Sequence, residues 1–156
     1  MKTIFYSVHN FEKKYLTLWC EKYGIKATFI EAHLTKDTLK LSGQHDSISC
    51  WASDDLSAEI LKELSNLGVK FISLRSAGFS HLDVNVAKQL GLMVARVPAY
   101  SSQAIAEHTL GLLMSLNRNL PRAFQRVKDF NFTLDGLEGI TLYGKSVGII
   151  GVGKIG

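Results

Sequence analysis

Short apolar runs alternate with amphipathic stretches through the first hundred residues, and this alternation constrains the fold more than any other feature of the sequence. The apolar runs have the length of strands, and the stretches between them have helical spacing. The runs occupy residues 3–8, 27–31, 47–51, 69–74 and 92–97. Strands that alternate with helices indicate parallel βαβ units, so we predict an α/β domain with an open, flavodoxin-like parallel sheet.

The segments between these runs have the signals of crossover helices. Residues 12–23, 57–67 and 83–90 have helical patterns, each followed by a glycine, and residues 35–41 form a further amphipathic stretch. Asp83 is placed to cap the third helix. Ligands of such sheets bind beyond the carboxyl ends of the strands, so we expect a site in the loops that begin near Ser7, Trp51, Arg75 and Pro98.

The pattern changes after Pro98. Residues 103–119 predict one long helix that is apolar over most of its circumference, so we expect it to be buried on several sides. A second helical segment reaches residue 130. Its basic side chains, spaced about one turn apart, are interpreted as a solvated face, with a phosphate-contacting stripe as the less favoured alternative. A buried-type strand is predicted at residues 146–150.

Composition excludes several classes of protein. Of 156 residues, 46% are hydrophobic and 21% charged, which is typical of a globular chain and argues against disorder. The net charge of +4 is scattered, which predicts no nucleic-acid partner. Cys20 and Cys50 lack the spacing of a disulfide framework or metal site, so we expect no metal. No apolar run reaches 18 residues, so we expect a cytoplasmic protein without a membrane partner.

The last six residues read G-x-G-x-x-G directly after the predicted strand, which indicates a dinucleotide-binding turn. Its candidate coenzyme-binding residues are Gly151, Gly153, Lys154, Ile155 and Gly156. The glycines permit a tight turn, close approach of the pyrophosphate and packing of a following helix. The alternative is a purely structural glycine turn. The helix that would hold the pyrophosphate and the acidic residue that would bind the ribose are not found in the sequence.

Four strings, in this order and spacing, carry a family resemblance: LRSAGFSHLD (74–83), VPAYS (97–101), AIAEHTLGLLMSLNR (104–118) and GIIGVGKIG (148–156). They resemble the N-terminal half of the NAD-dependent D-2-hydroxyacid dehydrogenases, most closely the fermentative D-lactate dehydrogenases. The resemblance implies a split fold. Residues 1–100 would form most of a substrate domain, and residues 101–156 the start of a Rossmann coenzyme domain, truncated at the glycine loop.

The resemblance also implies substrate-binding residues. The backbone N–H groups of Ser76, Ala77 and Gly78 would receive the substrate carboxylate, and the Tyr100 phenol would face the substrate. Trp51 would form a wall beside the substrate methyl group. Without the resemblance, these residues are a structural turn, an amphipathic surface tyrosine and a core tryptophan.

Other polar residues receive structural interpretations. Glu107 and His108 are adjacent on a helix and point in different directions, so they do not form a catalytic pair, and a hinge or packing role is favoured. Arg75 is expected to pair with a carboxylate.

The implied reaction is hydride transfer between NAD and a small 2-keto or 2-hydroxy acid, with D-lactate and pyruvate favoured. It needs an arginine, a histidine and a carboxylate that lie downstream in the family, so we assign no catalytic residue to this chain and expect it to be inactive alone. We expect a homo-oligomer formed through the 103–119 helix. Two alternatives stay open: a non-enzymatic, coenzyme-sensing protein like the corepressors of this fold, and a non-functional truncation product.

Overall fold

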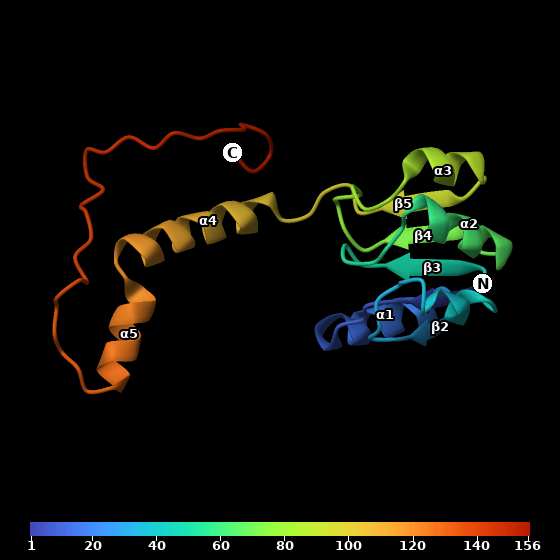
Figure 1. Cartoon of the computed structure of the whole chain (residues 1–156), viewed down its shortest axis with the longest axis horizontal. Coiled ribbons are helices and arrows are strands. Elements are labelled where there is room, and N and C mark those ends of the chain that lie inside the picture. The colour runs from blue at the N-terminus through green and yellow to red at the C-terminus, as the bar shows by residue number, and fades with distance from the viewer. The chain divides into compact units, whose positions relative to one another are not determined.

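The computed structural model describes all 156 residues and divides them into a unit that contains a sheet, Met1–Pro98, and a helical unit, Ala99–Gly156 (Figure 1). The sheet has five strands, all parallel, in the order β2-β1-β3-β4-β5. The strands are β1 (Lys2–Phe5), β2 (Lys26–Phe29), β3 (Ser47–Cys50), β4 (Phe71–Leu74) and β5 (Met93–Arg96). The predicted parallel α/β sheet is therefore confirmed, although each strand is shorter than the apolar run that predicted it.

Helices join the strands as the sequence patterns predicted. They are α1 (Asn10–Lys22), α2 (Ala58–Asn66) and α3 (Val84–Gln89), and the 35–41 stretch yields a short 3-10 helix, η1 (Leu39–Ser42). Asp83 caps α3, because its carboxylate accepts a 3.0 Å hydrogen bond from the Val86 N–H. This prediction is confirmed.

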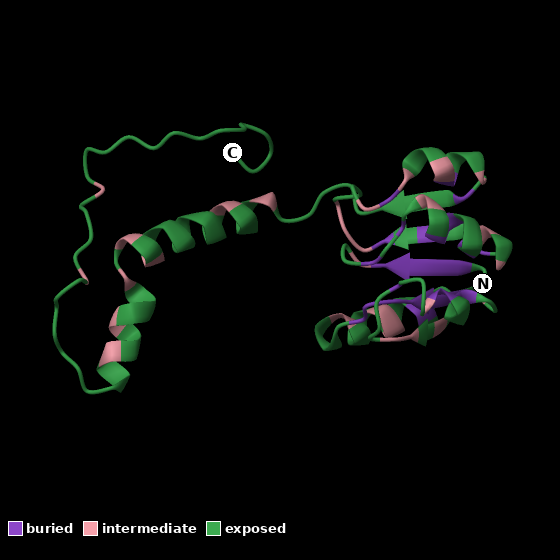
Figure 2. Ribbon diagram, viewed as in Figure 1, coloured by how far each residue is buried: buried purple, intermediate pink, exposed green.

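The sheet presents alternate side chains to two cores. On one face, Ile4, Ile48 and Ile72 pack with Ile60 and other apolar side chains from α2, α3 and the η1 region. On the other face, α1 covers a smaller cluster around Phe5 and Cys20. Figure 2 shows the consequence: β3 is buried along its whole length, while β5, at the edge of the sheet, is exposed.

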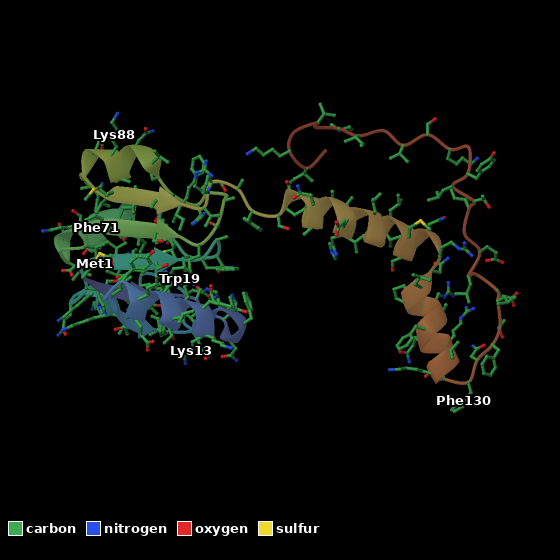
Figure 3. The ribbon with its side chains drawn as sticks, turned by 180° about the vertical axis from the view of Figure 1, so that it is seen from behind. Met1, Lys13, Trp19, Phe71, Lys88 and Phe130 are labelled. Atoms are coloured by element: carbon green, nitrogen blue, oxygen red, sulfur yellow. The ribbon has the colours of Figure 1, made fainter.

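Part of the α1 face of the sheet is not covered by a helix. A hollow of about 280 Å³ lies there, lined mainly by apolar side chains that include Met1, Phe5, Phe71 and Met93. Figure 3 labels two of these side chains, Met1 and Phe71. Phe71 and Met93 are 38% and 56% exposed. The hollow is an exposed apolar patch on the face of the sheet, separate from the loops at its carboxyl edge.

The second unit contains α4 (Ser102–Asn117) and α5 (Leu120–Lys128). The expectation that the long apolar helix would be buried on several sides is wrong for this structure, since α4 has no buried residue. A helix can bury an apolar surface only against a partner, and α4 packs mainly against α5, the other helix of its unit. The basic face of α5 is not simply solvated, because Arg122 and Arg126 donate hydrogen bonds to carbonyl groups of the loop that follows.

The strand predicted at residues 146–150 is not formed. Its residues are apolar enough for a buried strand, but a strand also needs a neighbour to pair its backbone groups. The unit Ala99–Gly156 contains no other strand that could supply those hydrogen bonds. The segment is therefore irregular and its isoleucines are exposed.

Candidate functional site

The carboxyl ends of β3 and β4 bring two predicted site segments to one edge of the sheet. Cys50 pairs with Leu74 in the register of these strands, so Trp51 and Arg75 each follow the last paired residue of their strand. The Arg75 N–H donates a 2.8 Å hydrogen bond to the Cys50 carbonyl, which continues the ladder by one step. The predicted turn at residues 76–78 begins directly after this bond.

The 76–78 turn has occupied carbonyl groups and free amides. The Ser76 carbonyl accepts from Val97 N at 3.2 Å, the Ala77 carbonyl from an Arg96 guanidinium nitrogen at 2.9 Å, and the Gly78 carbonyl from Ser76 Oγ at 2.8 Å. None of the three N–H groups donates to a protein acceptor. Successive free N–H groups in a turn are suited to an anion, since each is a donor with no competing partner.

The turn also leaves space for a ligand. A Cβ added to Gly78 would meet no heavy atom within 4 Å. Gly78 itself is exposed, and Ser76 and Ala77 are partly exposed. The Arg96 guanidinium, which holds the Ala77 carbonyl, also lies 5.1 Å from the centre of the Phe79 ring. The turn is therefore fixed by the protein and open to solvent.

Trp51 lies in an aromatic cluster at the same edge. Its ring is 5.2 Å from the His9 ring in an edge-on arrangement and 6.3 Å from the Phe11 ring. His9 and Phe11 stack with their ring planes 7° apart. The half-buried Trp51 is thus held as a wall by residues at the start of α1, and a polar hollow of about 180 Å³ lies beside His9.

Asp54, which the sequence analysis did not identify, connects three of the edge loops. Its buried carboxylate accepts hydrogen bonds from Ser7 Oγ at 2.6 Å, Leu34 N at 2.8 Å and Trp51 N at 2.6 Å. Because the Ser7 hydroxyl donates to Asp54, it accepts from Nδ1 of His33, 2.6 Å away. The carboxylate satisfies otherwise orphaned donors in the loops after β1, β2 and β3.

The Ser7 backbone adopts an unfavourable conformation within this network. Its φ of 52° lies in the left-handed region, which costs a residue other than glycine about 1–2 kcal/mol. Its N–H donates to the Ala32 carbonyl at 3.0 Å, and its hydroxyl lies between Asp54 and His33. The acidic pair Asp54-Asp55, three residues beyond the apolar run 47–51, was the only sequence signal for the network, and it does not indicate the partners.

Burial favours the neutral form of two side chains next to the site, the Cys50 thiol and the Tyr6 phenol. Burial raises the pKa of the Cys50 thiol well above its ordinary value of 9.0, and Asp54 adds to the rise, while Arg75 opposes it. Burial also raises the pKa of the Tyr6 phenol above 10.0. Cys50 is therefore a structural thiol rather than a nucleophile.

Tyr100 and the glycine loop belong to the second unit. Tyr100 is 61% exposed, so it is a surface tyrosine within its own unit. Glu107 and His108 are also exposed on α4, and neither makes a side-chain hydrogen bond or ion pair there. The structure therefore unites Trp51 with the 76–78 turn, while the other predicted residues lie in a separate unit.

The glycine loop fits a dinucleotide only in part. Gly151 has a φ of 93°, and a Cβ on Gly156 would collide with the Gly151 carbonyl oxygen, so both positions need glycine as a tight turn does. However, the structure has no strand before this loop and no helix after Lys128. The loop thus lacks the helix N-terminus that holds a pyrophosphate, and these residues do not form a coenzyme site by themselves.

Two further features bear on the type of site. No three His, Cys, Asp or Glu side chains gather closely enough to hold a metal ion. None of the helices combines the length and hydrophobicity that crossing a bilayer requires.

The fold defines a class of protein: a doubly wound α/β domain with a parallel five-stranded sheet, whose carboxyl edge carries a turn with free backbone amides. The model of the D-isomer specific 2-hydroxyacid dehydrogenase catalytic domain matches residues 4–146, and the chain belongs to this family.

Relatives of known sequence support the assignment. The chain is 47% identical over 156 residues to D-lactate dehydrogenase of Escherichia coli. This alignment covers 100% of this chain and 47% of that protein. It is 44% identical to a 2-hydroxyacid dehydrogenase homolog of Haemophilus influenzae, with the same coverage. The chain thus spans about half the length of the curated relatives it matches.

Solved structures agree. The apo structure of E. coli D-lactate dehydrogenase aligns with a TM-score of 0.88 and 46% identity, over 99% of this chain and 49% of that one. Aquifex aeolicus D-lactate dehydrogenase, solved with NAD and lactic acid, aligns with a TM-score of 0.79 and 29% identity, over 99% of this chain and 45% of that one.

Proposed function

We propose that this chain supplies the substrate-binding half of an NAD-dependent enzyme that interconverts a small 2-keto acid and its D-2-hydroxy acid, with pyruvate and D-lactate as the preferred pair. The observation that carries the proposal is the 76–78 turn, whose carbonyl groups are all occupied and whose amides are all free. The names of its relatives, D-lactate dehydrogenases among them, support the choice of substrate.

Each site residue then has a defined role. The amides of Ser76, Ala77 and Gly78 bind the substrate carboxylate, and Trp51 limits the space for the substrate side chain and excludes water. Tyr100 packs on the acyl group and hydrogen-bonds its oxygen. In this proposal residues 1–100 form the substrate domain and residues 101–156 begin the coenzyme domain.

The coenzyme, when bound, supplies or receives the hydride. Gly151, Gly153, Lys154, Ile155 and Gly156 are the residues of this chain proposed to contact it, once a strand and a helix flank their loop. We assign no arginine, histidine or carboxylate of this chain to the chemistry of hydride transfer: Arg96 holds the Ala77 carbonyl, and His33 contacts Ser7 and Asp54 in the network of the edge loops. We therefore expect no turnover from the chain alone, and self-association through the exposed apolar surface of α4.

Nuclear magnetic resonance of the ¹⁵N-labelled chain tests the proposal. Oxamate, an unreactive isostere of pyruvate, should shift the amide signals of residues 76–78, while lactamide, which has no carboxylate, should not. At Gly78 an added Cβ would meet no heavy atom within 4 Å, so we expect Gly78→Leu to fold, and its larger side chain should obstruct the amides and abolish the shifts. Gly148→Leu, at an equally open glycine, is the matched control and should leave them unchanged.

Two results would contradict the proposal. One is an oxamate response confined to other residues. The other is pyruvate-dependent oxidation of NADH by the purified chain, since the catalytic groups would then have to lie within these 156 residues.

A further inference from the structure

Arg75 forms a buried ion pair at the edge that carries the candidate site. Its side chain is 9% exposed and that of its partner, Glu12 in the first turn of α1, is 13% exposed. The Nε atom donates to Glu12 Oε2 at 3.1 Å, and an Nη atom donates to Oε1 at 3.2 Å. The pair is thus bidentate, which is the strong and directional form of this interaction. The expectation that Arg75 pairs with a carboxylate is confirmed.

The same guanidinium binds the ends of two neighbouring strands. Nη1 donates to the Ser49 carbonyl at 2.9 Å and to Ser49 Oγ at 3.2 Å. Nη2 donates to the carbonyls of Tyr6 at 2.7 Å and Ser7 at 3.1 Å. A guanidinium has five N–H donors in a rigid plane, and here each has an acceptor within the protein. Arg75 therefore has no free donor with which to bind a substrate carboxylate.

Arg75 also contacts Trp51. The guanidinium carbon lies 5.6 Å from the centre of the Trp51 ring, within the range of a cation-π interaction. The residue after Arg75 is Ser76, the first of the 76–78 turn. The Arg75 side chain therefore contacts α1, the ends of β1 and β3 and the Trp51 ring, and its backbone leads directly into the 76–78 turn.

We propose that Arg75, held by Glu12, is a positioning residue that sets the 76–78 turn and the Trp51 ring for substrate binding. This inference rests on the proposed function of that turn. The rigid fork is the essential feature, because an ammonium group has three donors at one point and cannot reach acceptors on α1, β1 and β3 together. Lysine at this position keeps the charge and loses the positioning.

The test compares Arg75→Lys and Glu12→Gln with Glu59→Gln, which breaks the exposed ion pair between Glu59 and Lys36 and serves as the control. The first readout is the dissociation constant of oxamate for the folded chain, measured from the amide shifts of residues 76–78. We expect Arg75→Lys to weaken binding at least about tenfold, as misplacement of binding groups does. Glu12→Gln should weaken binding by a smaller factor, and Glu59→Gln should leave it unchanged.

The second readout needs no ligand. In both Arg75→Lys and Glu12→Gln, the amide signals of residues 76–78 and the Trp51 indole signal should move, because the turn and the ring lose the contacts that set them. A purely structural role would lower global stability without a local change in the turn. If Arg75→Lys does not fold, Glu12→Gln, which keeps the arginine and all its backbone acceptors, decides the question with both readouts.

The outcomes separate this proposal from the one it rests on. Unchanged oxamate affinity together with an unchanged turn in a folded variant would overturn the positioning role. If oxamate fails to shift the turn of the unaltered chain, the proposed function fails, and the ligand-free readout still decides whether Arg75 sets the turn.

Discussion

Replacing Asp54 by asparagine tests whether the carboxylate network holds the site edge together. Oδ1 accepts from Ser7 and Leu34, and Oδ2 accepts from Trp51, at 2.6–2.8 Å. Asparagine has one acceptor oxygen. In its best orientation it keeps the Oδ1 bonds and turns its NH₂ group toward the Trp51 N–H, so that two donors face each other.

The cost follows from these contacts. A buried donor without an acceptor costs about 1–3 kcal/mol, and the remaining bonds lose the strengthening that the charge provides. We therefore expect Asp54→Asn to lower the free energy of unfolding by about 2–4 kcal/mol. Asp37→Asn, at an exposed position without a hydrogen-bonded carboxylate, should change it by less than about 0.5 kcal/mol.

Urea unfolding followed by far-ultraviolet circular dichroism measures both variants, and Trp51 fluorescence in a Trp19→Phe background reports on the edge itself. We expect Asp54→Asn to alter the native emission of Trp51 as well as the midpoint. A loss as small as that of Asp37→Asn, with unchanged emission, would refute the reasoning.

Three further predictions concern the core and the uncovered face of the sheet. Tyr6→Phe should cost about 1–2 kcal/mol in urea unfolding, because the fully buried phenol shares a 2.7 Å hydrogen bond with Ser42; an unchanged midpoint would contradict this. Stability should fall as pH rises above about 9. The pKa values of Cys50, Cys20 and Tyr6 are raised in the folded chain, so these groups ionise at lower pH in the unfolded chain than in the folded one. A pH titration of the unfolding midpoint should show a shallower decline for Cys50→Ala than for the unaltered chain. The chain should bind the dye anilinonaphthalene sulfonate at the apolar hollow, and Phe71→Asp should reduce that binding; equal dye fluorescence would place the dye elsewhere.

The sheet could be predicted from the sequence because each strand and its crossover helix carry their own local pattern. The Asp83 cap is likewise a contact across three residues, and its partner lies within the pattern. Such elements need only one stretch of sequence to be recognised.

Elements that depend on a distant partner could not be predicted. Residues 146–150 have the composition of a strand, but no strand in their unit pairs with them. Asp54 reaches Ser7 across 47 residues, and Glu12 reaches Arg75 across 63. A charge in the sequence predicts that a partner exists, while only the topology identifies it.

The most direct measurement of the central claim is a crystal structure of the chain with oxamate bound. The account predicts that the oxamate carboxylate accepts hydrogen bonds of about 3 Å from the amides of residues 76–78, with Trp51 beside the ligand and Arg75 still paired with Glu12. A carboxylate bound instead to the Arg75 guanidinium, or a ligand found only in the hollow on the face of the sheet, would contradict it.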